Sequence, residues 1–281
     1  MAERRRVDQL LVECGLVESR ARAQALVLAG QVYSGDRRID KPGTPLAVGT
    51  PLRLKGQDHP WVSRGGLKLA HALASFPLDP AGRVAIDVGA STGGFTDVLL
   101  SHGAARVYAV DVGHGQLAWK LRTDPRVTVL ERTNARALTV AEIPEPADWV
   151  VCDASFIGLE TVLPAALALT RPGAVLVALI KPQFEVGKGR VGKGGVVREP
   201  ELHQEVCERI RAWLSGLPGW RVEGLVESPI LGPEGNREFL IVGRRDGADA
   251  VPPAGPQPDG SASGGAGPGR GEGQNPIITE G

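Results

Sequence analysis

Apolar and polar residues follow each other along this chain in two rhythms, one typical of strands and one of helices. Between residues 84 and 111 an apolar run, a glycine-rich turn, a helical spacing and a second apolar run succeed one another. This order predicts a strand, loop, helix, strand unit. Further apolar runs at 127–130, 149–152, 175–180, 222–226 and 239–242 predict strands, and 202–217 has helical spacing. The pattern is that of an α/β domain.

The first 56 residues carry a shorter pattern of their own. Apolar residues at 10–12 predict a short helix that ends at Gly15, and Ser19 is placed to cap a second helix. Short strands are expected at 32–33 and 51–54. We therefore predict a small separate module before the α/β domain.

A helix is also expected over residues 63–76. Its inner face should carry the apolar residues Leu67, Ala70, Leu73 and Ala74. Lys68 stands beside them, and from its position alone it could be an ordinary surface lysine.

The glycine-rich turn after residue 88 has the features of a nucleotide site. Gly89, Gly93 and Gly94 would let the backbone turn sharply and lie against a ligand. Asp111 follows the next strand, about 20 residues beyond the first glycine, where an acid can bind a ribose hydroxyl pair. The spacing is Gly-x-x-x-Gly-Gly, whereas enzymes that bind a dinucleotide pyrophosphate have Gly-x-Gly-x-x-Gly. We therefore favour S-adenosylmethionine over NAD.

Charged residues follow several of the predicted strands. Asp87, Asp111, Asp153 and Lys181 all stand at carboxyl ends, which is the edge where ligands bind in an open parallel sheet. The stretch after Lys181, residues 181–200, is basic and rich in glycine, and a loop of this kind closes over a substrate or is simply mobile.

The stretch Asp-Ala-Ser-Phe that begins at Asp153 allows three methyl-transfer chemistries to be compared. Enzymes that methylate amino groups of nucleic acids have two prolines that are missing here. Cytosine carbon-5 chemistry needs a nucleophilic cysteine, but strand alternation turns Cys152 away from Asp153, so we interpret it as a buried structural residue. A hydroxyl acceptor remains. A lysine beside a second cation, positioned by carboxylates, can serve as the base, and Lys68, Asp153, Lys181 and Glu238 supply that set.

Composition narrows the class of protein. The 281 residues are 42% hydrophobic and 23% charged with zero net charge, which is typical of a globular protein. Residues 1–75 hold 12 Lys or Arg against 7 acids, net +5, whereas 246–281 hold 1 against 5, net −4. In the latter segment 16 of 36 residues are Gly or Pro, so we predict a disordered tail.

Several classes of site and location are disfavoured. The odd number of cysteines, Cys14, Cys152 and Cys207, fits a reduced cytoplasm. No apolar run approaches the length of a membrane helix, about 18 residues. We expect no metal site, because the histidines share no ligand spacing; they are His59, His71, His102, His114 and His203.

The N-terminal module resembles an S4 domain, the RNA-binding module of ribosomal protein S4 and several RNA-modifying enzymes. The resemblance rests on RVDQLLVECGLVESRARAQALVLAGQVYSGDRRIDKPGTPLAVGTPLRL. Basic side chains at the helix starts could meet a phosphate backbone. The predicted RNA-binding residues are Arg4, Arg5, Arg6, Arg20, Arg22, Lys41 and Arg64.

As a whole, the chain resembles the TlyA family of S4-containing ribosomal RNA 2′-O-methyltransferases, whose members are also labelled haemolysins. The matching stretches are VSRGGLKL, DVGASTGGFTDVLL, VDVGHGQLAWKLR, ERTNAR, DASFI, LIKPQFEVGKG and GPEGNREF. The resemblance implies a class I Rossmann-like, FtsJ-like methyltransferase domain with a mostly parallel seven-stranded sheet. It also implies cytidine in ribosomal RNA as the acceptor. Members with an extended N-terminal arm, which MAERRR resembles, are implied to modify both ribosomal subunits.

The same resemblance implies the site residues. The catalytic tetrad maps onto Lys68, Asp153, Lys181 and Glu238. Contacts to S-adenosylmethionine map onto Gly89, Ala90, Ser91, Thr92, Gly93, Gly94, Phe95, Thr96, Asp111, Val112, Asn134 and Asp153.

These arguments give a domain plan and a ranked set of functions. We expect an S4 domain over 1–58, a linker over 59–63, a methyltransferase domain over 64–245 and a disordered tail over 246–281. The predicted protein is a cytoplasmic enzyme that acts on ribosomal RNA in the 30S subunit, the 50S subunit or both, without metal or membrane. The alternatives are a non-catalytic RNA-binding assembly factor and, less favoured, a pore-forming haemolysin.

Overall fold

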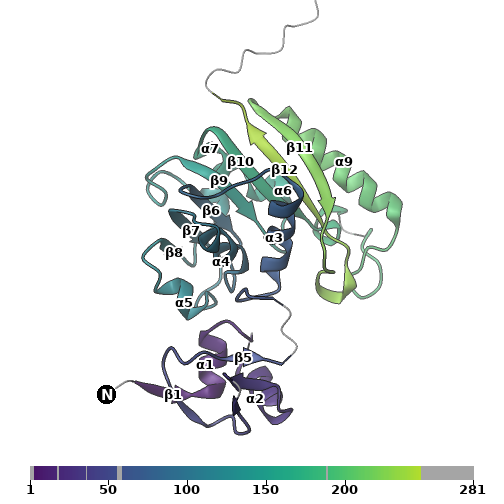
Figure 1. The fold of residues 1–281 in the computed structure, drawn as a ribbon. Helices are drawn as coiled ribbons and strands as arrows, with labels where there is room; N and C mark the ends of the chain where they lie inside the picture. Colours follow the sequence, from purple (N-terminus) through teal and green to yellow (C-terminus); the bar gives the residue numbers. More distant parts are fainter. Residues whose placement is uncertain (1–2, 18, 36, 56–58, 188, 248–281) are drawn as a thin grey trace, which may run out of the picture. The chain divides into compact units, whose positions relative to one another are not determined.

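The N-terminal module forms a small core of its own. The computed structural model, drawn in Figure 1, describes residues 3–17, 19–35, 37–55, 59–187 and 189–247. The module contains β1 (Arg4–Arg6), α1 (Val7–Glu13), α2 (Arg20–Leu28), β2 (Val32–Ser34), β3 (Arg37–Arg38), β4 (Pro45–Ala47) and β5 (Arg53–Leu54). Strand β1 pairs with β4, while β2 lies between β3 and β5.

Local sequence explains where the module's helices begin and end. The Ser19 hydroxyl accepts a hydrogen bond from the Arg22 amide at 3.2 Å, which confirms the predicted cap. Gly15 and Gly30 both have positive φ and follow the two helices. Apolar residues from α1, α2 and β2 then fill the core, among them Val7, Leu11, Ala23, Leu26, Val27 and Val32.

The second part of the chain is the predicted α/β domain. Its strands are β6 (Val84–Val88), β7 (Arg106–Val110), β8 (Val127–Leu130), β9 (Ala147–Cys152), β10 (Thr170–Ile180), β11 (Trp220–Glu227) and β12 (Phe239–Arg245). Its helices are α3 (Gly65–Ser75), α4 (Gly94–Ser101), α5 (Trp119–Arg122), α6 (Leu159–Val162), α7 (Pro164–Ala168), α8 (Pro182–Glu185) and α9 (Pro200–Gly216), with short 3₁₀ turns η1 (Ala135–Ala137) and η2 (Pro233–Gly235).

The seven strands form one sheet in the order β11-β12-β10-β9-β6-β7-β8. Strands β10, β9, β6, β7 and β8 run parallel, and β12 is antiparallel to both β10 and β11. This confirms the mostly parallel seven-stranded sheet. Because β12 runs against β10, its first residue lies at the edge where the parallel strands end.

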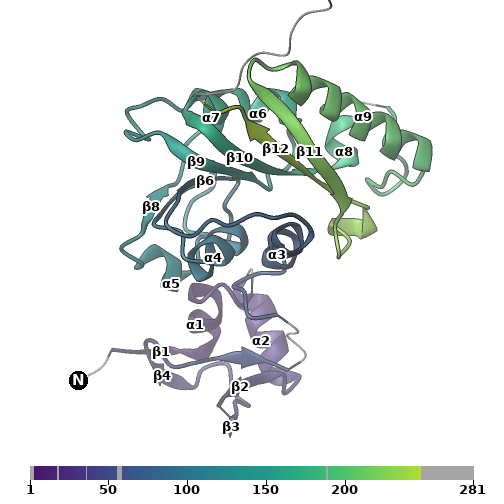
Figure 2. The same ribbon diagram turned by 45° about the horizontal axis from the view of Figure 1, so that its top comes forward.

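Helices cover both faces of the sheet (Figure 2). On one face, Val162, Ile210 and other residues of α6, α7 and α9 pack against Ile86, Val150 and Leu176. On the other face, Leu69 and Val98 of α3 and α4 pack against the alternate strand residues, such as Ala85, Val151 and Val177. Alternate residues of each strand therefore serve two cores, as expected of a sheet buried on both sides.

Two sequence expectations differ from the structure. The buried face of α3 is made by Gly66, Lys68, Leu69 and Ala72, whereas Ala74 is exposed. The expected inner face was wrong by about one residue, because it was drawn from the apolar residues alone and left out Lys68. The segment 181–200 was expected to be loop throughout, but it begins with the short helix α8, which Pro182 starts.

The predicted disordered tail lies almost wholly outside the described residues, which end at Gly247. Asp246, its first residue, still belongs to the sheet region. Its amide donates to the Gly219 carbonyl at 2.7 Å, and its carboxylate lies 3.0 Å from Arg221.

Candidate active site

The register of the sheet brings three predicted catalytic residues to one edge. Ala178 of β10 pairs with Cys152 of β9, and Ile180 of β10 pairs with Phe239 of β12. The residues just after β9 and β10 and the residue just before β12 are therefore neighbours. They are Asp153, Lys181 and Glu238.

Lys181 is held at this edge by three acceptors. Its ammonium nitrogen Nζ lies 2.6 Å from Asp153 Oδ1, and it donates hydrogen bonds to the Asp153 carbonyl at 3.1 Å and to Ser155 Oγ at 2.9 Å. With the side chain only 7% exposed, these charge-assisted contacts fix the position of Nζ. We did not predict Ser155, although it stands inside the Asp-Ala-Ser-Phe stretch.

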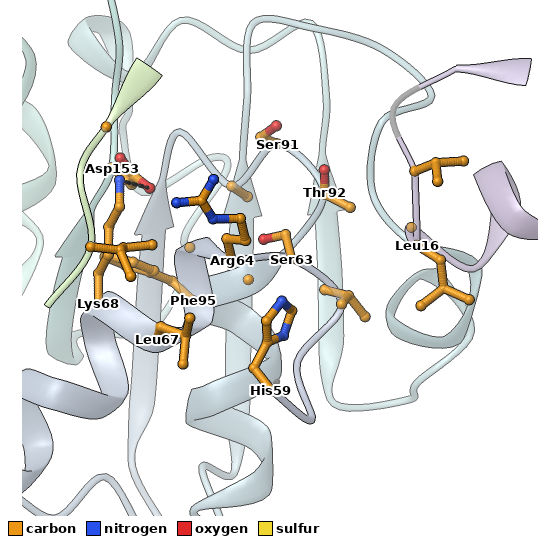
Figure 3. A pocket seen from close by; sticks show the side chains of 18 of the residues that line it. Leu16, His59, Ser63, Arg64, Leu67, Lys68, Ser91, Thr92, Phe95 and Asp153 are labelled. Atoms are coloured by element: carbon orange, nitrogen blue, oxygen red, sulfur yellow. Dashed lines mark ion pairs between the residues drawn. The ribbon is translucent and has the colours of Figure 1, made fainter. Parts of the chain in front are cut away.

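Lys68 enters the same site from α3 and pairs with Glu238. Its Nζ lies 2.6 Å from Glu238 Oε2 and 3.8 Å from Asp153 Oδ2, and Figure 3 shows Lys68 and Asp153 facing each other. The Lys68 and Glu238 side chains are 8% and 0% exposed, so Lys68 is not a surface lysine. The sequence grouped both carboxylates around a single catalytic lysine. Instead each lysine has its own carboxylate, because α3 packs against β12 and brings Lys68 to Glu238.

The carboxylate of Glu238 depends on the turn between β11 and β12. A β-carbon on Gly232 would lie 2.1 Å from Glu238 Oε1, so only glycine leaves room for this oxygen. The Gly232 amide donates to the Asn236 carbonyl at 2.8 Å, which closes the turn. Glu238 Oε1 is buried and has no hydrogen-bond partner among the described residues.

The glycines of the predicted cofactor loop are required by the fold itself. Gly89 and Gly93 have φ of 79° and 97°. A β-carbon would lie 2.8 Å from Ala154 Cα at position 89 and 2.3 Å from a Leu121 methyl at position 93. Gly94 is equally restricted, since its β-carbon would lie 2.4 Å from Ser63 Oγ. The glycines therefore let the loop pack closely against its neighbours in the protein. The sequence analysis had explained the same glycines by the close approach of a ligand.

Two carboxylates flank this loop. Asp111 accepts hydrogen bonds from the Ser91 amide at 2.8 Å and the Gly113 amide at 2.6 Å, and its remaining lone pairs can still accept from hydroxyl groups. Asp87 is 0% exposed and accepts from the amide and hydroxyl of Thr96 through Oδ2. Its other oxygen, Oδ1, is buried without a hydrogen-bond partner among the described residues, and burial raises the pKa of Asp87 to about 7.

The predicted cofactor residues separate into two groups. Those that line the same pocket as Lys68, Lys181 and Asp87 are Gly89, Ala90, Ser91, Thr92, Gly94, Phe95 and Asp153. Gly93, Thr96, Asp111, Val112 and Asn134 are not among its lining residues. Val112 is 74% exposed. The Asn134 carboxamide oxygen accepts from the Arg136 amide at 3.1 Å and so caps η1.

Cys152 and Phe156 differ sharply in exposure. Cys152 is fully buried, and burial raises the pKa of its thiol to about 12, so it is not poised as a nucleophile. This agrees with our interpretation of Cys152 as structural. Phe156 is 89% exposed, and its ring lies 4.9 Å from that of Phe184, centroid to centroid. An aromatic ring is thus displayed three residues after Asp153.

Left-handed backbone is concentrated around this site. The non-glycine residues with positive φ in the described part of the chain are Ser91, Arg132, Phe156 and Glu234. The first three follow β6, β8 and β9, and Glu234 lies in the turn before β12. All four are therefore in loops at the carboxyl edge of the sheet, where backbone strain often accompanies function.

The predicted RNA-binding residues differ in how free their charges are. Arg6 and Arg20 both pair with Asp8, which is fully buried, yet their side chains stay 48% and 53% exposed. The Arg6 guanidinium holds the pKa of the Asp8 carboxyl well below its usual range. Arg5 pairs with Glu3 and Glu13, and Arg4 donates to the Pro45 carbonyl.

The other three predicted RNA-binding residues have exposed side chains, and they are Arg22, Lys41 and Arg64. Arg64 is one of the residues that line the pocket in Figure 3, and one of its guanidinium nitrogens lies 3.5 Å from the Leu231 carbonyl oxygen. This arginine therefore bridges the start of α3 and the turn that carries Glu238.

The described residues contain neither a cluster of metal ligands nor a membrane-spanning helix. No group of three or more His, Cys, Asp or Glu side chains in this part of the chain is arranged to hold a metal ion. Likewise, none of the described helices is long and apolar enough to cross a membrane.

Comparison with known proteins places this geometry in context. The model of the FtsJ-like methyltransferase family matches residues 61–245, and the S4 domain model matches residues 5–51. The chain is 50% identical to the 16S/23S rRNA (cytidine-2′-O)-methyltransferase TlyA of Mycobacterium tuberculosis, over 86% of this chain and 90% of that protein. It is 36% identical to hemolysin A of Brachyspira hyodysenteriae, over 84% and 98% of the two chains.

A solved structure agrees with these sequence matches. A Streptococcus thermophilus protein, provisionally named a hemolysin, superimposes with a TM-score of 0.67 at 44% identity and covers 88% of this chain and 90% of its own.

Proposed function

The chain belongs to the FtsJ-like methyltransferase family and, within it, to the TlyA proteins that carry an S4 domain, and we propose that it methylates the ribose 2′-OH of cytidine in ribosomal RNA. The observation that carries the proposal is the pair of ion pairs at the sheet edge, Lys181 with Asp153 and Lys68 with Glu238. A thiolate mechanism has no candidate there, because the Cys152 thiol is buried.

The proposed chemistry needs a group that positions a weakly acidic hydroxyl and removes its proton. We assign this role to Lys181, whose Nζ is held in place by Asp153 and Ser155. Its ammonium form can orient the 2′ oxygen for in-line attack, and its neutral amine form can accept the hydroxyl proton. Lys68, held by Glu238, lies 3.8 Å from the second oxygen of Asp153 and keeps that carboxylate in position. These four roles support a hydroxyl acceptor rather than a base nitrogen.

We propose S-adenosylmethionine as the methyl donor, which supplies an electrophilic methyl group on a sulfonium. The residues present fit such a ligand. Asp87 Oδ1 is a buried acceptor that lacks a donor, and the α-amino group of the cofactor can supply one. Asp111 retains lone pairs for ribose hydroxyls, and Val112 would offer exposed apolar surface to the adenine. Asn134 and the loop 89–96 complete the proposed contacts.

The RNA would be held by both parts of the chain. The exposed cations Arg22, Lys41 and Arg64 and the half-exposed Arg6 and Arg20 supply phosphate contacts. Phe156 offers a ring on which a base that has left its stack can pack next to Asp153. We also propose the domain bounds 1–58 for the S4 domain, 59–63 for the linker, 64–245 for the methyltransferase domain and 246–281 for the tail. If ribosomal subunits are the substrate, the enzyme works in the cytoplasm.

The test is methyl transfer from labelled S-adenosylmethionine to separated 30S and 50S subunits, followed by digestion to nucleosides and mass spectrometry. Label recovered as ribose-methylated cytidine is the expected result. The labelled subunit or subunits then show which ribosomal RNA the enzyme methylates. Label on a base would instead favour an amino acceptor. If neither subunit is labelled, the binding-factor alternative becomes the better account.

The Lys181→Ala variant separates an enzyme from an assembly factor. It should still sediment with ribosomal subunits but lose methyl transfer, because Lys181 contacts the acceptor and not the S4 domain's RNA. An assembly factor with no catalytic role would keep its cellular effect in this variant.

A further inference from the structure

The loop between α8 and α9 is more constrained than its sequence indicates. Residues 186–199 include Gly187, Gly189, Gly194 and Gly195, all with positive φ, and glycine gives a loop no intrinsic stiffness. Nevertheless Val196 and Val197 are 7% and 2% exposed. The second half of this basic loop must therefore be fastened by contacts from elsewhere in the domain.

Asn236 supplies that fastening. Its side-chain oxygen accepts a hydrogen bond from the Val197 amide at 3.1 Å, and its side-chain nitrogen donates to the Gly195 carbonyl at 3.0 Å. Asn236 is 2% exposed, so solvent cannot replace these bonds. A carboxamide carries an acceptor oxygen and a donor nitrogen side by side, which matches a backbone donor and a backbone acceptor two residues apart.

A second buried side chain acts on the same strip of loop. His203 of α9 is 4% exposed, and its Nε2 lies 2.9 Å from the Val197 carbonyl oxygen. The ring packs against Phe239, the first residue of β12, with centroids 5.7 Å apart. The loop is therefore attached on both sides to the start of the strand that follows Glu238.

The same asparagine also shapes the turn that carries Glu238. Its carbonyl accepts the Gly232 amide, and Gly232 is the residue whose missing β-carbon leaves room for the Glu238 carboxylate. Only Arg237 separates Asn236 from Glu238, whose Oε2 lies 2.6 Å from Lys68 Nζ. Asn236 therefore belongs to the same turn as the carboxylate that pairs with Lys68.

We propose that Asn236 is a positioning residue that locks the basic loop 189–199 to the turn that carries Glu238. The loop would then hold bound RNA at a fixed position relative to the Lys68–Glu238 pair. Lys193 and Arg198 present exposed cations on this loop, while Arg190 pairs with Glu205. The inference rests on the proposed function for its RNA partner. The lock itself is a property of the chain alone.

The test compares Asn236→Ala with Arg237→Ala in the full-length protein. Arg237 is the next residue, but its exposed side chain pairs with Glu227 on the sheet edge, so it is a matched control. Trypsin, which cleaves after Arg190, Lys193 and Arg198, should cut the loop at least about fivefold faster in Asn236→Ala than in the control. This readout requires neither RNA nor activity.

Kinetics then link the lock to catalysis. In Asn236→Ala, kcat on ribosomal subunits should fall about tenfold or more and KM for the subunit should rise, while the affinity for S-adenosylmethionine stays within about twofold. If the parent protein methylates neither subunit, the proposed function fails, and the proteolysis result still decides the lock. If Asn236→Ala and Arg237→Ala match in both proteolysis and kcat, the proposal is overturned.

Asn236→Asp guards against a variant that simply folds poorly. The new carboxyl is nearly isosteric and can keep the bond from the Val197 amide. Only its neutral form can also donate to the Gly195 carbonyl, and burial favours that form. Its kcat relative to the parent should therefore recover as pH falls from about 8 to about 6. A ratio that stays flat across this range counts against the lock.

Discussion

Glu238 Oε1 occupies space that is free only because residue 232 is glycine: a β-carbon there would lie 2.1 Å from this oxygen. The two residues belong to one turn, so the carboxylate cannot retreat without moving the turn or leaving Lys68. We expect Gly232→Ala to displace the carboxylate and to lower kcat about 100-fold. The affinity for S-adenosylmethionine, measured by calorimetry, should change little. Gly216→Ala is the control, since a β-carbon at 216 meets nothing within 4 Å and should leave kcat unchanged.

The buried pair Lys68–Glu238 leads to a prediction about stability. Lys68→Met leaves the Glu238 carboxylate, which is 0% exposed, without its ion-pair partner, and should destabilise the fold by about 3 kcal/mol. The double variant Lys68→Met, Glu238→Gln removes both charges and should recover most of that loss. Urea unfolding of the two single variants, the double variant and the parent measures the coupling. Additive losses would show that the two side chains do not depend on each other.

Asp87 should make stability depend on pH. Burial raises its pKa to about 7 in the folded protein, against about 4 in an unfolded chain, so the folded state holds the proton more tightly. This contribution is fully present below pH ~4 and is lost as pH rises through ~7. The stability of Asp87→Asn relative to the parent should therefore increase as pH rises from 4 to 8. It should also bind S-adenosylmethionine more weakly, and unchanged affinity would remove Asp87 from the proposed cofactor site.

Phe156 offers a test of how the target base is held. Replacing the 89% exposed ring with alanine removes little buried surface, so stability should hardly change. If the target base stacks on the ring, kcat/KM for the ribosomal subunit should fall about tenfold in Phe156→Ala, with unchanged affinity for S-adenosylmethionine. Phe156→Tyr should retain activity. Val140→Ala, at another exposed apolar residue, is the control.

In the S4 module, Asp8 should control both stability and the geometry of two arginines. The pKa of Asp8 is depressed, first of all by its hydrogen bonds from Arg6, so its contribution is present above the ordinary carboxyl pKa and is lost in acid. Asp8→Ala should destabilise the fold at neutral pH, because it leaves Arg6, Arg20 and Gln24 without their shared acceptor. The loss should stay at about 1–2 kcal/mol, since both guanidinium groups are half exposed and water can solvate them. Binding to ribosomal RNA should weaken as well. Asp40→Ala, which removes an exposed partner of Arg38, is the comparison.

The sequence predicted the positions of site residues that follow directly from the ends of parallel strands. It failed for residues whose partners are set by the packing of helices on the sheet. Asp153 and Lys181 could be placed together because parallel strands end at one edge of a sheet. The partner of Glu238 could not, since the packing of α3 on β12 has no signature in residue spacing. The same gap explains the wrong inner face for α3, because a hydrophobic pattern does not count a buried lysine such as Lys68 as part of that face.

Other features of the site were hidden because they are relations between distant residues. Ser155 was visible in the sequence, but its bond to Lys181 depends on how the chain turns after β9. The role of Gly232 depends on a carboxylate six positions later. Asn236 sits in the quoted stretch GPEGNREF, yet its partners at positions 195 and 197 lie on a loop about 40 residues earlier, so periodicity could not connect them.

The four left-handed residues at the sheet edge, Ser91, Arg132, Phe156 and Glu234, have a consequence for directed evolution of this enzyme. A left-handed backbone costs each of these residues on the order of 1 kcal/mol of folding stability, a cost that glycine at the same position avoids. A screen for heat resistance alone should therefore select glycine at these positions. The selected variants should have a higher melting temperature and a lower kcat. A screen that also demands methyl transfer should leave them untouched and find its gains in the helices far from this edge.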